Sequence, residues 1–365
     1  MKKIKYGICQ ILKSQMITTN YKEIFNLDKA VLDEIDPEIN KLLWFWESGK
    51  NKITVHTSGS TGNPKKINIY KNQMIESAKN TLHYFDIKNN STFLNCLPVK
   101  YIGGKMMLIR AILSKSKIVL YEPSVNPINE LNTEIDFIGL TPLQLNYLLE
   151  KKHIFKKIKL AIIGGGLVSE NLISKIQNLT TNCFQTYGMT ETISHIAVRN
   201  LKNCSNETPY NCLDDFKVGA NKKNQLIINS KKLDIENLVT NDRIQIISNE
   251  EFVFLNRSDN MINSGGLKIN PQEVENKILK LLGNNNFFID KIKNDKFGEE
   301  IILIALKKIK IDLLIQSIKL LKDKKIQPKK IYIVDKFLFN DNQKIDKLKS
   351  KSYAFKLKNI HTITN

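Results

Sequence analysis

Short apolar segments alternate with helix-like segments through the first half of the chain, and this alternation is what most constrains its fold. Thr92–Leu97, Lys117–Tyr121 and Leu160–Ile163 have the length and the apolar content of buried strands. Asn72–Phe85, just before the first of these runs, carries apolar residues at helical spacing, and a further helix is expected over Leu143–Glu150, between the second run and the third. Strands that alternate with helices are typical of a parallel sheet, so the pattern predicts an α/β fold.

The pattern changes twice in the second half. From about 215 to 254 the β segments become shorter, which predicts a small barrel-like β subdomain. Beyond a polar stretch, an amphipathic helix is expected over Pro271–Leu282, and a helix over Ile311–Lys322 lies between two strand-like runs. We therefore expect two domains, a large one over residues 1–256 and a small α+β one over 257–365.

Composition limits the class of protein. At 365 residues, with 42% hydrophobic and 25% charged residues, the chain has the make-up of a soluble globular protein. We find no apolar run long enough to span a bilayer and no secretory signal behind its basic start. Its five cysteines are scattered and form no C-x-x-C pair, which argues against a disulfide scaffold or structural zinc. A cytoplasmic location is therefore expected.

The formal net charge of +20 has two interpretations. One is nucleic-acid binding. The lysines, however, are spread along the chain among asparagine and isoleucine, and no zinc finger, RNP-type aromatic motif or arginine-rich tail accompanies them. Such a balance favours anionic small ligands such as ATP and coenzyme A by long-range attraction. We therefore expect no nucleic-acid partner.

The loop His56–Lys65 combines hydroxyl groups, glycines and a lysine directly after the strand-like run Lys52–Val55. Glycines let backbone N–H groups approach a ligand, hydroxyls donate hydrogen bonds, and lysine adds a mobile positive charge. This mixture suits an anion with several oxygens, although the spacing is not that of a Walker A motif. A flexible linker is the alternative interpretation. The candidate phosphate ligands are Thr57, Ser58, Gly59, Ser60, Thr61, Gly62 and Lys65.

A second loop, Tyr187–Thr192, follows a strand-like run. We expect it at the carboxyl edge of the sheet, where ligand sites of α/β proteins form. Tyr187 offers a flat face for stacking on a base, Thr190 can donate to a phosphate, and Glu191 is an oxygen ligand suited to Mg²⁺. The alternative is a capped helix start with Thr190 at the cap.

Four further segments have the composition of ligand contacts. Gly164–Gly166 permits close backbone approach by a flat ligand, and Asp242 can accept hydrogen bonds from a ribose diol. Asn256–Ile269 is either a hinge or an ordinary polar linker between domains. Lys344 lies in Asn342–Lys347, where a lysine is otherwise a solvated surface residue.

Taken in order, these segments resemble the signature motifs of the adenylate-forming superfamily, which includes acyl- and aryl-CoA ligases, luciferases and peptide-synthetase adenylation domains. The resemblance extends from Lys52 to Lys347 and departs from the family at Asn241, Asn256 and Gln343, where glycine is typical. It implies a large N-terminal adenylate-forming domain of parallel-rich sheets and helices with a small β subdomain. A small, mobile α+β domain is expected to follow.

The resemblance also implies residue roles, with ATP, Mg²⁺ and coenzyme A as cofactors or co-substrates. Lys344, Glu191 and Thr190 are the expected catalytic residues, and Glu191 holds the metal. The small domain is expected to rotate at Asp259. Besides the loop at 57–65, the expected nucleotide contacts are Gly164, Gly165, Gly166, Tyr187, Gly188, Asp242 and Arg257, and the coenzyme A path passes Gly265 and Gly266.

Within the superfamily, Leu97–Met107 and Thr192–Ala197 most resemble ligases that join an anionic aromatic acid to coenzyme A. The implied reaction is attack of a small-molecule carboxylate on the α-phosphate of ATP, followed by transfer of the acyl group from AMP to the thiol. Lys100, Ser194 and His195 are candidate contacts to the acid, although His195 is equally well a core-edge histidine.

Other interpretations stay open at this point. The chain is alternatively another aryl- or acyl-CoA ligase, or an adenylation enzyme that loads a carrier protein. Outside the superfamily, the alternative is a basic nucleic-acid-binding protein without enzymatic activity. The oligomeric state is open, with a homo-oligomer as one alternative.

Overall fold

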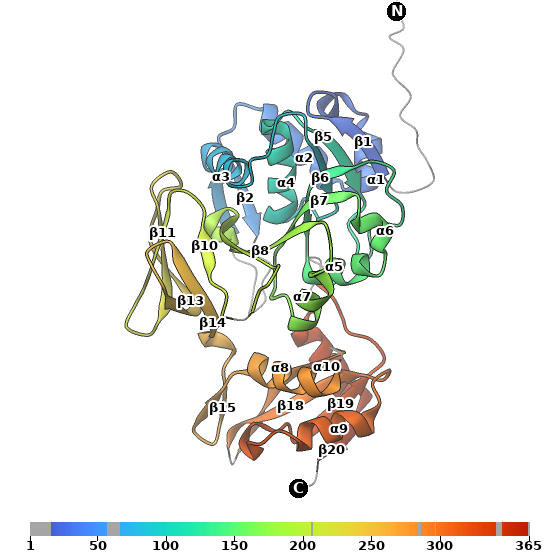
Figure 1. Cartoon of the computed structure of the whole chain (residues 1–365), viewed down its shortest axis with the longest axis vertical. Coiled ribbons are helices and arrows are strands. Elements are labelled where there is room, and N and C mark those ends of the chain that lie inside the picture. The colour runs from blue at the N-terminus through green and yellow to red at the C-terminus, as the bar shows by residue number, and fades with distance from the viewer. Residues whose placement is uncertain are drawn as a thin grey trace, which may run out of the picture.

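The computed structural model of the chain describes residues 16–56, 66–205, 207–283, 286–295, 297–340 and 345–363. Their secondary structure forms a larger body and a smaller body, which lies below the larger one in Figure 1. The two are joined after strand β14 (Glu251–Arg257) by the short 3-10 helix η3 (Ser258–Asn260). No helix among these residues has the length and apolar character needed to cross a lipid bilayer.

The larger body is built on a twelve-stranded sheet, counted over the described residues, in the order β1-β5-β4-β6-β7-β8-β9-β10-β14-β13-β12-β11. Its centre, from β5 to β8, is parallel, and antiparallel strands extend it on both sides. The remaining strands of this sheet are β1 (Met16–Asn20), β4 (Thr92–Asn95), β5 (Lys117–Tyr121), β6 (Ile135–Leu140), β7 (Ile158–Ile163), β8 (Asn182–Gly188), β9 (His195–Asn200), β10 (Tyr210–Cys212), β11 (Phe216–Ala220), β12 (Gln225–Ser230) and β13 (Ile235–Ile246).

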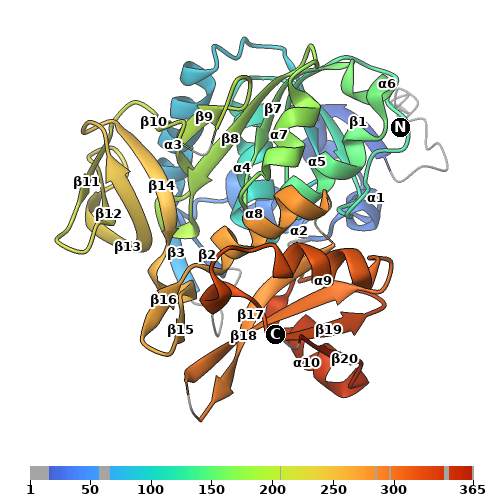
Figure 2. The same ribbon diagram turned by 60° about the horizontal axis from the view of Figure 1, so that its bottom comes forward.

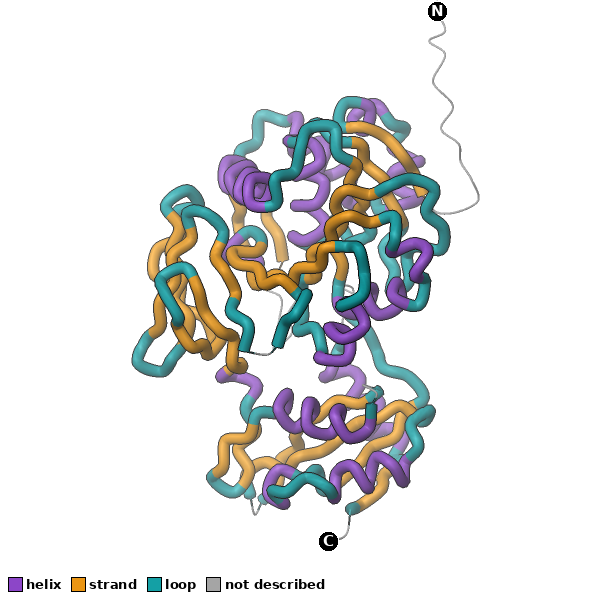
Figure 3. Tube along the Cα trace, in the orientation of Figure 1, coloured by secondary structure: helices purple, strands orange, loops and turns teal. Residues whose placement is uncertain are grey.

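Helices cover both faces of the parallel part, as the purple segments of Figure 3 show. On one face lie α1 (Lys29–Ile35), α2 (Glu38–Glu47), α3 (Lys71–Tyr84) and α4 (Ile102–Leu113), and on the other α5 (Pro142–Leu149), α6 (Lys152–Phe155) and α7 (Glu170–Ile176). The short 3-10 helices η1 (Glu23–Asn26) and η2 (Thr190–Thr192) complete this body in the described part of the chain.

The core alternates along each central strand. Phe93 of β4 lies opposite Phe137 of β6, and both pack with the helices of the first face. Their neighbours Leu94 and Ile138 are also paired, and they pack with α5, α6 and α7. Because successive strand residues point to opposite faces, a strand that is apolar throughout requires cover on both sides. The apolar runs of the sequence therefore dictate a three-layer arrangement.

The smaller body has a six-stranded sheet in the described residues, with the order β16-β15-β18-β19-β20 and β17 beside β18. Helices α8 and α9 pack on one face and α10 on the other, and Figure 2 brings this body forward. The elements are β15 (Ile262–Ser264), β16 (Leu267–Ile269), α8 (Pro271–Leu282), β17 (Phe287–Asn294), β18 (Gly298–Leu306), α9 (Ile311–Lys319), η4 (Lys324–Ile326), β19 (Lys330–Val334), α10 (Lys347–Leu357) and β20 (Ile360–Thr362).

The structure corrects one expectation and adds one strand. The strands from β11 to β14 do not close into a separate barrel, because β10 pairs with both β9 and β14 and so joins them to the edge of the main sheet. The strand expected over Lys52–Val55 is present as β2 (Lys52–His56), but it pairs with an unforeseen antiparallel strand, β3 (Lys66–Tyr70). The candidate phosphate loop therefore connects two strands of a hairpin.

Most expected elements agree with the structure to within a few residues. The strand over Lys117–Tyr121 and the helix over Pro271–Leu282 have the predicted bounds. The helix expected over Leu143–Glu150 begins at Pro142, where Gln144 N donates to Thr141 Oγ1 (3.2 Å) as an N-cap requires. The α/β fold with a smaller second α+β body is confirmed.

Candidate functional site

The candidate site lies at the carboxyl edge of the parallel strands. Strands β4, β6, β7 and β8 are hydrogen-bonded in parallel, so the loops that follow Asn95, Leu140, Ile163 and Gly188 emerge along the same edge. In open α/β sheets, ligands bind outside this edge. The topology therefore brings the glycine run after β7 beside the loop after β8.

The glycine run Gly164–Gly166 is constrained by its neighbours. A Cβ on Gly164 would lie 2.8 Å from Thr186 Oγ1, and Gly165 has φ +81°, which side chains rarely tolerate. Gly166 is exposed, and its carbonyl oxygen accepts a hydrogen bond from Gln185 Nε2 (3.0 Å). The run thus presents exposed backbone at Gly165 and Gly166 and is hydrogen-bonded to β8 through Gly166 O.

Three expected nucleotide contacts from distant parts of the chain converge. The hydroxyl of Tyr187 donates to Asp242 Oδ2, and Arg257 Nη1 lies 3.1 Å from Asp242 Oδ1. Arg257 also forms a two-point pair with Asp259, from Nε (3.0 Å) and Nη2 (2.7 Å). Burial raises the pKa of the Asp242 carboxyl, while the bond from Tyr187 and the charge of Arg257 oppose the shift. A carboxylate and a guanidinium thus stand together beside an aromatic ring.

The Tyr187 ring is supported by other aromatic rings. Its centroid lies 5.2 Å from that of Phe252 and 5.9 Å from that of Tyr210, both in edge-on geometry. Burial raises the pKa of its hydroxyl well above the usual value. The ring is held in one orientation by these contacts and by its bond to Asp242.

The loop after β8 carries the candidate metal ligand. Thr190 and Glu191 lie in η2, and the exposed carboxylate of Glu191 has no hydrogen-bond partner among the residues that the structure describes. A Cβ on Gly188 would lie 2.4 Å from His195 Cα, so only glycine fits there. Mg²⁺ in nucleotide sites is bound by one or two carboxylates together with phosphates and water, and a single accessible Glu191 carboxylate fits this donor set.

A strained turn follows this loop. Ile193 is buried and has φ +64° and ψ −42°, and Ser194 N donates to Thr192 O at 2.6 Å. This is a γ-turn, which is rare for a β-branched residue. The turn reverses the chain so that Ser194 points back toward α4.

Ser194 meets a buried cation that the motifs did not indicate. Arg110 of α4 is 1% exposed, its Nη2 donates to Ser194 Oγ (2.5 Å), and its Nε has no hydrogen-bond partner. Burial lowers the pKa of the Arg110 guanidinium to about 9. In the described part of the chain no carboxylate pairs with Arg110. A buried guanidinium without a counter-ion is costly, so this environment suits an external anion.

His195 lies beside Ser194 and close to this cation. Its Nε2 is 3.1 Å from Thr81 Oγ1 of α3, and its Nδ1 is 3.4 Å from Ser194 Oγ. Burial and then the charge of Arg110 lower the pKa of the imidazole well below 6.5. The structure thus brings Ser194 and His195 together around Arg110. The third candidate, Lys100, is exposed, with its ammonium 5.6 Å from the centroid of the Tyr101 ring.

The remaining candidates lie at or beyond the junction of the two bodies. Asp259 is in η3, between the last strand of the large sheet and β15. Gly265 (φ +57°) and Gly266 (φ +82°) form the turn of the β15–β16 hairpin. The positive φ values explain the two glycines without any ligand, and a path for coenzyme A past them stays a prediction.

Two groups of candidates lie outside the described residues, namely 57–65 with its phosphate ligands and Lys344. The structure describes what flanks them. His56 pairs with Lys66, and Phe339 forms a bridge with Ile345.

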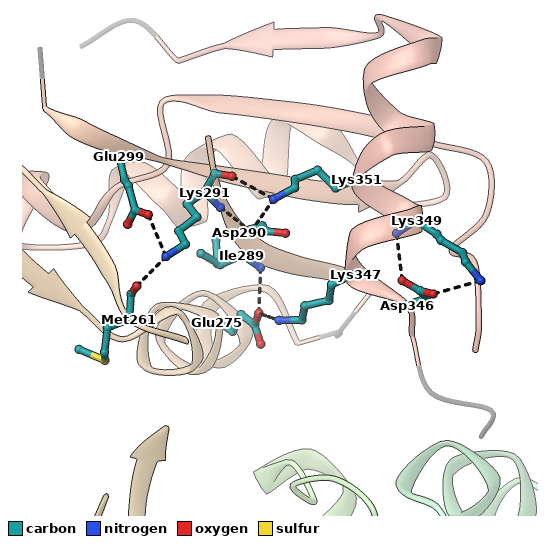
Figure 4. Close-up of polar contacts among 10 residues, drawn as sticks. All are labelled: Met261, Glu275, Ile289, Asp290, Lys291, Glu299, Asp346, Lys347, Lys349 and Lys351. Atoms are coloured by element: carbon teal, nitrogen blue, oxygen red, sulfur yellow. Dashed lines mark hydrogen bonds and ion pairs between the residues drawn. The ribbon is translucent and has the colours of Figure 1, made fainter. Parts of the chain in front are cut away.

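Helix α10, which follows Lys344, is tied to the small body. Figure 4 shows Lys347 paired with Glu275 of α8 (2.9 Å) and Lys351 with Asp290 of β17 (3.1 Å). Asp346 caps the helix by accepting from Lys349 N (2.9 Å).

Sequence reasoning missed three residues of this region: Arg110, Gln185 and Arg199. Arg110 had a usable signal, because it is the one arginine in the otherwise apolar segment Met106–Leu113. A charged residue in an apolar helix is either at its polar face or buried with a purpose. Gln185 and Arg199 had none, since their pairing depends on the register of β8 and β9.

The fold and this arrangement define a class: in sequence and architecture the chain resembles the adenylate-forming enzymes. Residues 52–214 match the family model described as AMP-binding enzyme. An acyl-CoA synthetase (AMP-forming)/AMP-acid ligase II-like protein from Dyadobacter fermentans is 27% identical, with a TM-score of 0.59 over 93% of this chain and 99% of that one.

Other relatives have a more specific name, which they share. The 2-succinylbenzoate–CoA ligases of Listeria monocytogenes (strain F2365) and Haemophilus influenzae are 24% and 25% identical, over 74% and 75% of this chain. The chain spans 62% and 63% of their lengths, less than two thirds. The Bacillus subtilis O-succinylbenzoate coenzyme A synthetase solved with ATP and magnesium is 21% identical, with a TM-score of 0.69 over 82% of this chain and 69% of that one.

Proposed function

We propose that this protein is an ATP-dependent, AMP-forming acid–CoA ligase, and that its acid is 2-succinylbenzoate (o-succinylbenzoate), as in menaquinone biosynthesis. The class is supported by the family match over 52–214 and by the names of the relatives. The choice of acid is supported by those names together with the chemistry around Arg110.

One observation carries the proposal. Arg110 is a buried guanidinium with an unpaired Nε, and it lies against Ser194, three residues after the candidate metal ligand Glu191. An acid that keeps one carboxylate while the other reacts would provide the missing counter-ion. 2-Succinylbenzoate has two carboxyl groups, whereas a fatty acid has one. A monocarboxylic substrate would leave Arg110 without a charged partner.

The proposed nucleotide site uses the convergence at the sheet edge. The adenine lies between Gly164–Gly166 and the Tyr187 ring. Asp242 accepts hydrogen bonds from the ribose hydroxyls, and Arg257 lies beside it (3.1 Å). The loop at 57–65 binds the β- and γ-phosphates, and Thr190 donates to a phosphate oxygen. Mg²⁺, when bound at Glu191, neutralises phosphate charge.

In the first half-reaction, an oxygen of the reacting carboxylate attacks the α-phosphorus of ATP. A new C–O–P linkage forms, the bond from the α-phosphorus to the bridging oxygen breaks, and pyrophosphate leaves. The carboxylate is already a nucleophile, so no general base is needed. The enzyme must hold like charges together and stabilise the charge that develops on phosphorus, a role we assign to Lys344.

In the second half-reaction, the sulfur of coenzyme A attacks the acyl carbon. The thiol proton is lost, the bond from the acyl carbon to the phosphate oxygen breaks, and AMP leaves as the thioester forms. We assign the hinge to Asp259, so that the small domain presents Lys344 for the first step and withdraws it for the second. The proposed boundary between the domains lies between residues 256 and 257, at the last residue of β14.

A substrate panel tests this function. Pyrophosphate release is measured with ATP and Mg²⁺ and one of 2-succinylbenzoate, benzoate or a fatty acid, and the thioester is then measured after adding coenzyme A. We expect turnover with 2-succinylbenzoate and little with the monocarboxylic acids. Turnover of benzoate or a fatty acid at the same rate would show that 2-succinylbenzoate is not the specific acid of this enzyme. If the thioester formed only on a carrier protein, the acceptor would be that protein and not coenzyme A.

The Lys344→Ala variant tests the catalytic assignment. We expect it to lose adenylate formation and to keep thioester formation from supplied acyl-adenylate. Equal loss of both halves would contradict alternation of the small domain. Strongly salt-dependent RNA or DNA binding without ATP turnover would overturn the enzyme proposal as a whole.

A further inference from the structure

A second buried arginine, Arg199 of β9, lies behind the proposed nucleotide site. It is 4% exposed, and no carboxylate pairs with it among the described residues. Its Nε (3.0 Å) and Nη2 (2.7 Å) both donate to Gln185 Oε1, and its Nη1 donates to Ser205 O (3.4 Å). The guanidinium is therefore satisfied by neutral acceptors alone.

Gln185 links Arg199 to the glycine run Gly164–Gly166 by hydrogen bonds. It is 1% exposed and sits directly opposite Arg199 in the β8–β9 ladder. While its Oε1 accepts from Arg199, its Nε2 donates to Gly166 O (3.0 Å). Both ends of one amide are thus used, one on the cation and one on the backbone that faces the proposed adenine.

Arg199 also supports the opposite wall of that site. Its guanidinium carbon lies 5.0 Å from the centroid of the Tyr210 ring. Tyr210 stacks on Phe252 at 5.5 Å and meets the Tyr187 ring edge-on at 5.9 Å. One buried cation therefore contacts, through one intermediate residue each, the Gly166 carbonyl and the Tyr187 ring.

We propose that Arg199 and Gln185 form a positioning pair that sets the separation of Gly166 and Tyr187 and thereby the affinity for the nucleotide. This inference rests on the proposed function, in which the adenine lies between these two groups. The pair touches neither the acid nor the reacting atoms. It therefore acts on ATP binding and leaves the acid site around Arg110 alone.

The choice of glutamine is what makes the pair testable. A glutamate at 185 would accept from Arg199 at least as well, because a carboxylate matches the guanidinium fork. It cannot donate to Gly166 O, however, and would place two acceptors against each other. The Gln185→Glu variant therefore keeps the link to Arg199 and removes only the link to Gly166.

The experiment measures Gln185→Glu in the full chain by equilibrium binding of ATP, by steady-state kinetics with ATP and acid varied separately, and by thermal unfolding. We expect the Kd and KM for ATP to rise roughly tenfold, the size expected for one lost hydrogen bond and an opposed acceptor. The KM for the acid and kcat should stay within about twofold, and Tm should not fall.

Gln177→Glu is the matched control. Gln177 also donates from Nε2 to backbone carbonyls, of Ile173 (2.8 Å) and Leu201 (2.9 Å), and accepts from Asn203 N (2.8 Å). The same chemical change there should leave ATP binding unaltered. Equal losses of ATP affinity in both variants would overturn the proposal, because the effect would then be general.

Arg199→Lys provides a second test if Gln185→Glu is poorly folded. A lysine ends in a single nitrogen and cannot reproduce the contact of two nitrogens with Gln185 Oε1. We therefore expect the same selective loss of ATP affinity, with the acid KM unchanged. A folded variant that binds ATP as the wild type does would overturn the positioning role. Wild-type protein that binds no ATP would overturn the proposed function itself, so the two failures are distinguishable.

Discussion

Arg110 and Arg199 are both buried in the larger body without a carboxylate partner among the described residues, yet their surroundings differ. Arg199 has acceptors on all three of its nitrogens and an aromatic ring against its face. Arg110 has one acceptor, Ser194 Oγ, and an unpaired Nε. The fold therefore satisfies the cation of Arg199 but leaves that of Arg110 incompletely paired.

The difference separates two uses of a buried charge. A cation whose hydrogen bonds are complete stabilises the arrangement of its neighbours, and its removal leaves those neighbours unpaired. A cation whose bonds are incomplete lowers the stability of the free protein, and a ligand with the opposite charge relieves that effect. Arg199 therefore belongs to the support of the site, and Arg110 to its ligand contacts.

The largest expected effect is that of Arg110→Met. Removing the proposed counter-ion of the acid should raise the KM for 2-succinylbenzoate about 100-fold or more, since breaking a buried ion pair is worth about 3–5 kcal/mol. The free energy of unfolding should stay the same or rise, because an unpaired buried cation is removed. Pyrophosphate release and urea unfolding measure the two quantities. If the variant were less stable and its KM for the acid were unchanged, Arg110 would support the fold and would not contact the acid.

Arg199→Met should do the opposite. We expect the free energy of unfolding to fall by about 2–3 kcal/mol, because Gln185 Oε1 and Ser205 O lose a donor and Tyr210 loses its cation. The KM for the acid should stay within about twofold. Urea unfolding beside the acid KM is the measurement. An acid KM raised as far as in Arg110→Met would show that the two regions are not separate.

Ser194→Ala sharpens the comparison further. It removes the acceptor of Arg110 Nη2, and hydrogen bonds to charged groups are worth about 1.5–3 kcal/mol, so we expect a fall of about 2 kcal/mol in unfolding free energy. In the Arg110→Met background this loss should disappear. A double-mutant cycle measures the difference. Additive effects would contradict a direct contact between the two side chains.

The smallest effect concerns pH. Because burial and the charge of Arg110 lower the pKa of His195, the unfolded chain binds a proton near pH 6.5 that the folded protein does not. Stability should be complete above about pH 6.5 and should fall by about 1 kcal/mol on acidification to about pH 5.5. Urea unfolding at both pH values, with His195→Gln as the reference, isolates this contribution. An equal pH dependence of wild type and His195→Gln would contradict it.

Much of the fold could be predicted because its signals are local. The run Lys117–Tyr121 is a largely buried strand between β1 and β4, and the amphipathic pattern of Pro271–Leu282 requires one buried helix face. The merger of β11–β14 with the main sheet could not be predicted, since it depends on the pairing of the short strand β10 with β14. Strand β3 was missed although Lys66–Tyr70 alternates polar and apolar residues.

The candidate site divides in the same way. Glycines, the aromatic residue and the acidic residues of the motifs were recognisable by type and order, and the structure brings Tyr187, Asp242 and Arg257 together. The position of Ser194 against Arg110 was not recognisable, because it requires both α4 packed on the sheet and the γ-turn at Ile193.

By itself, the order of residues determined which segments are strands, which are helices and which loops carry polar, glycine-rich chemistry. These properties follow from side-chain periodicity and from the backbone freedom of glycine, which act over a few residues. Only the tertiary structure decided which of two similar arginines has its hydrogen bonds completed. Burial and acceptor geometry arise when distant segments pack together, so a residue's type cannot reveal whether its charge is already paired.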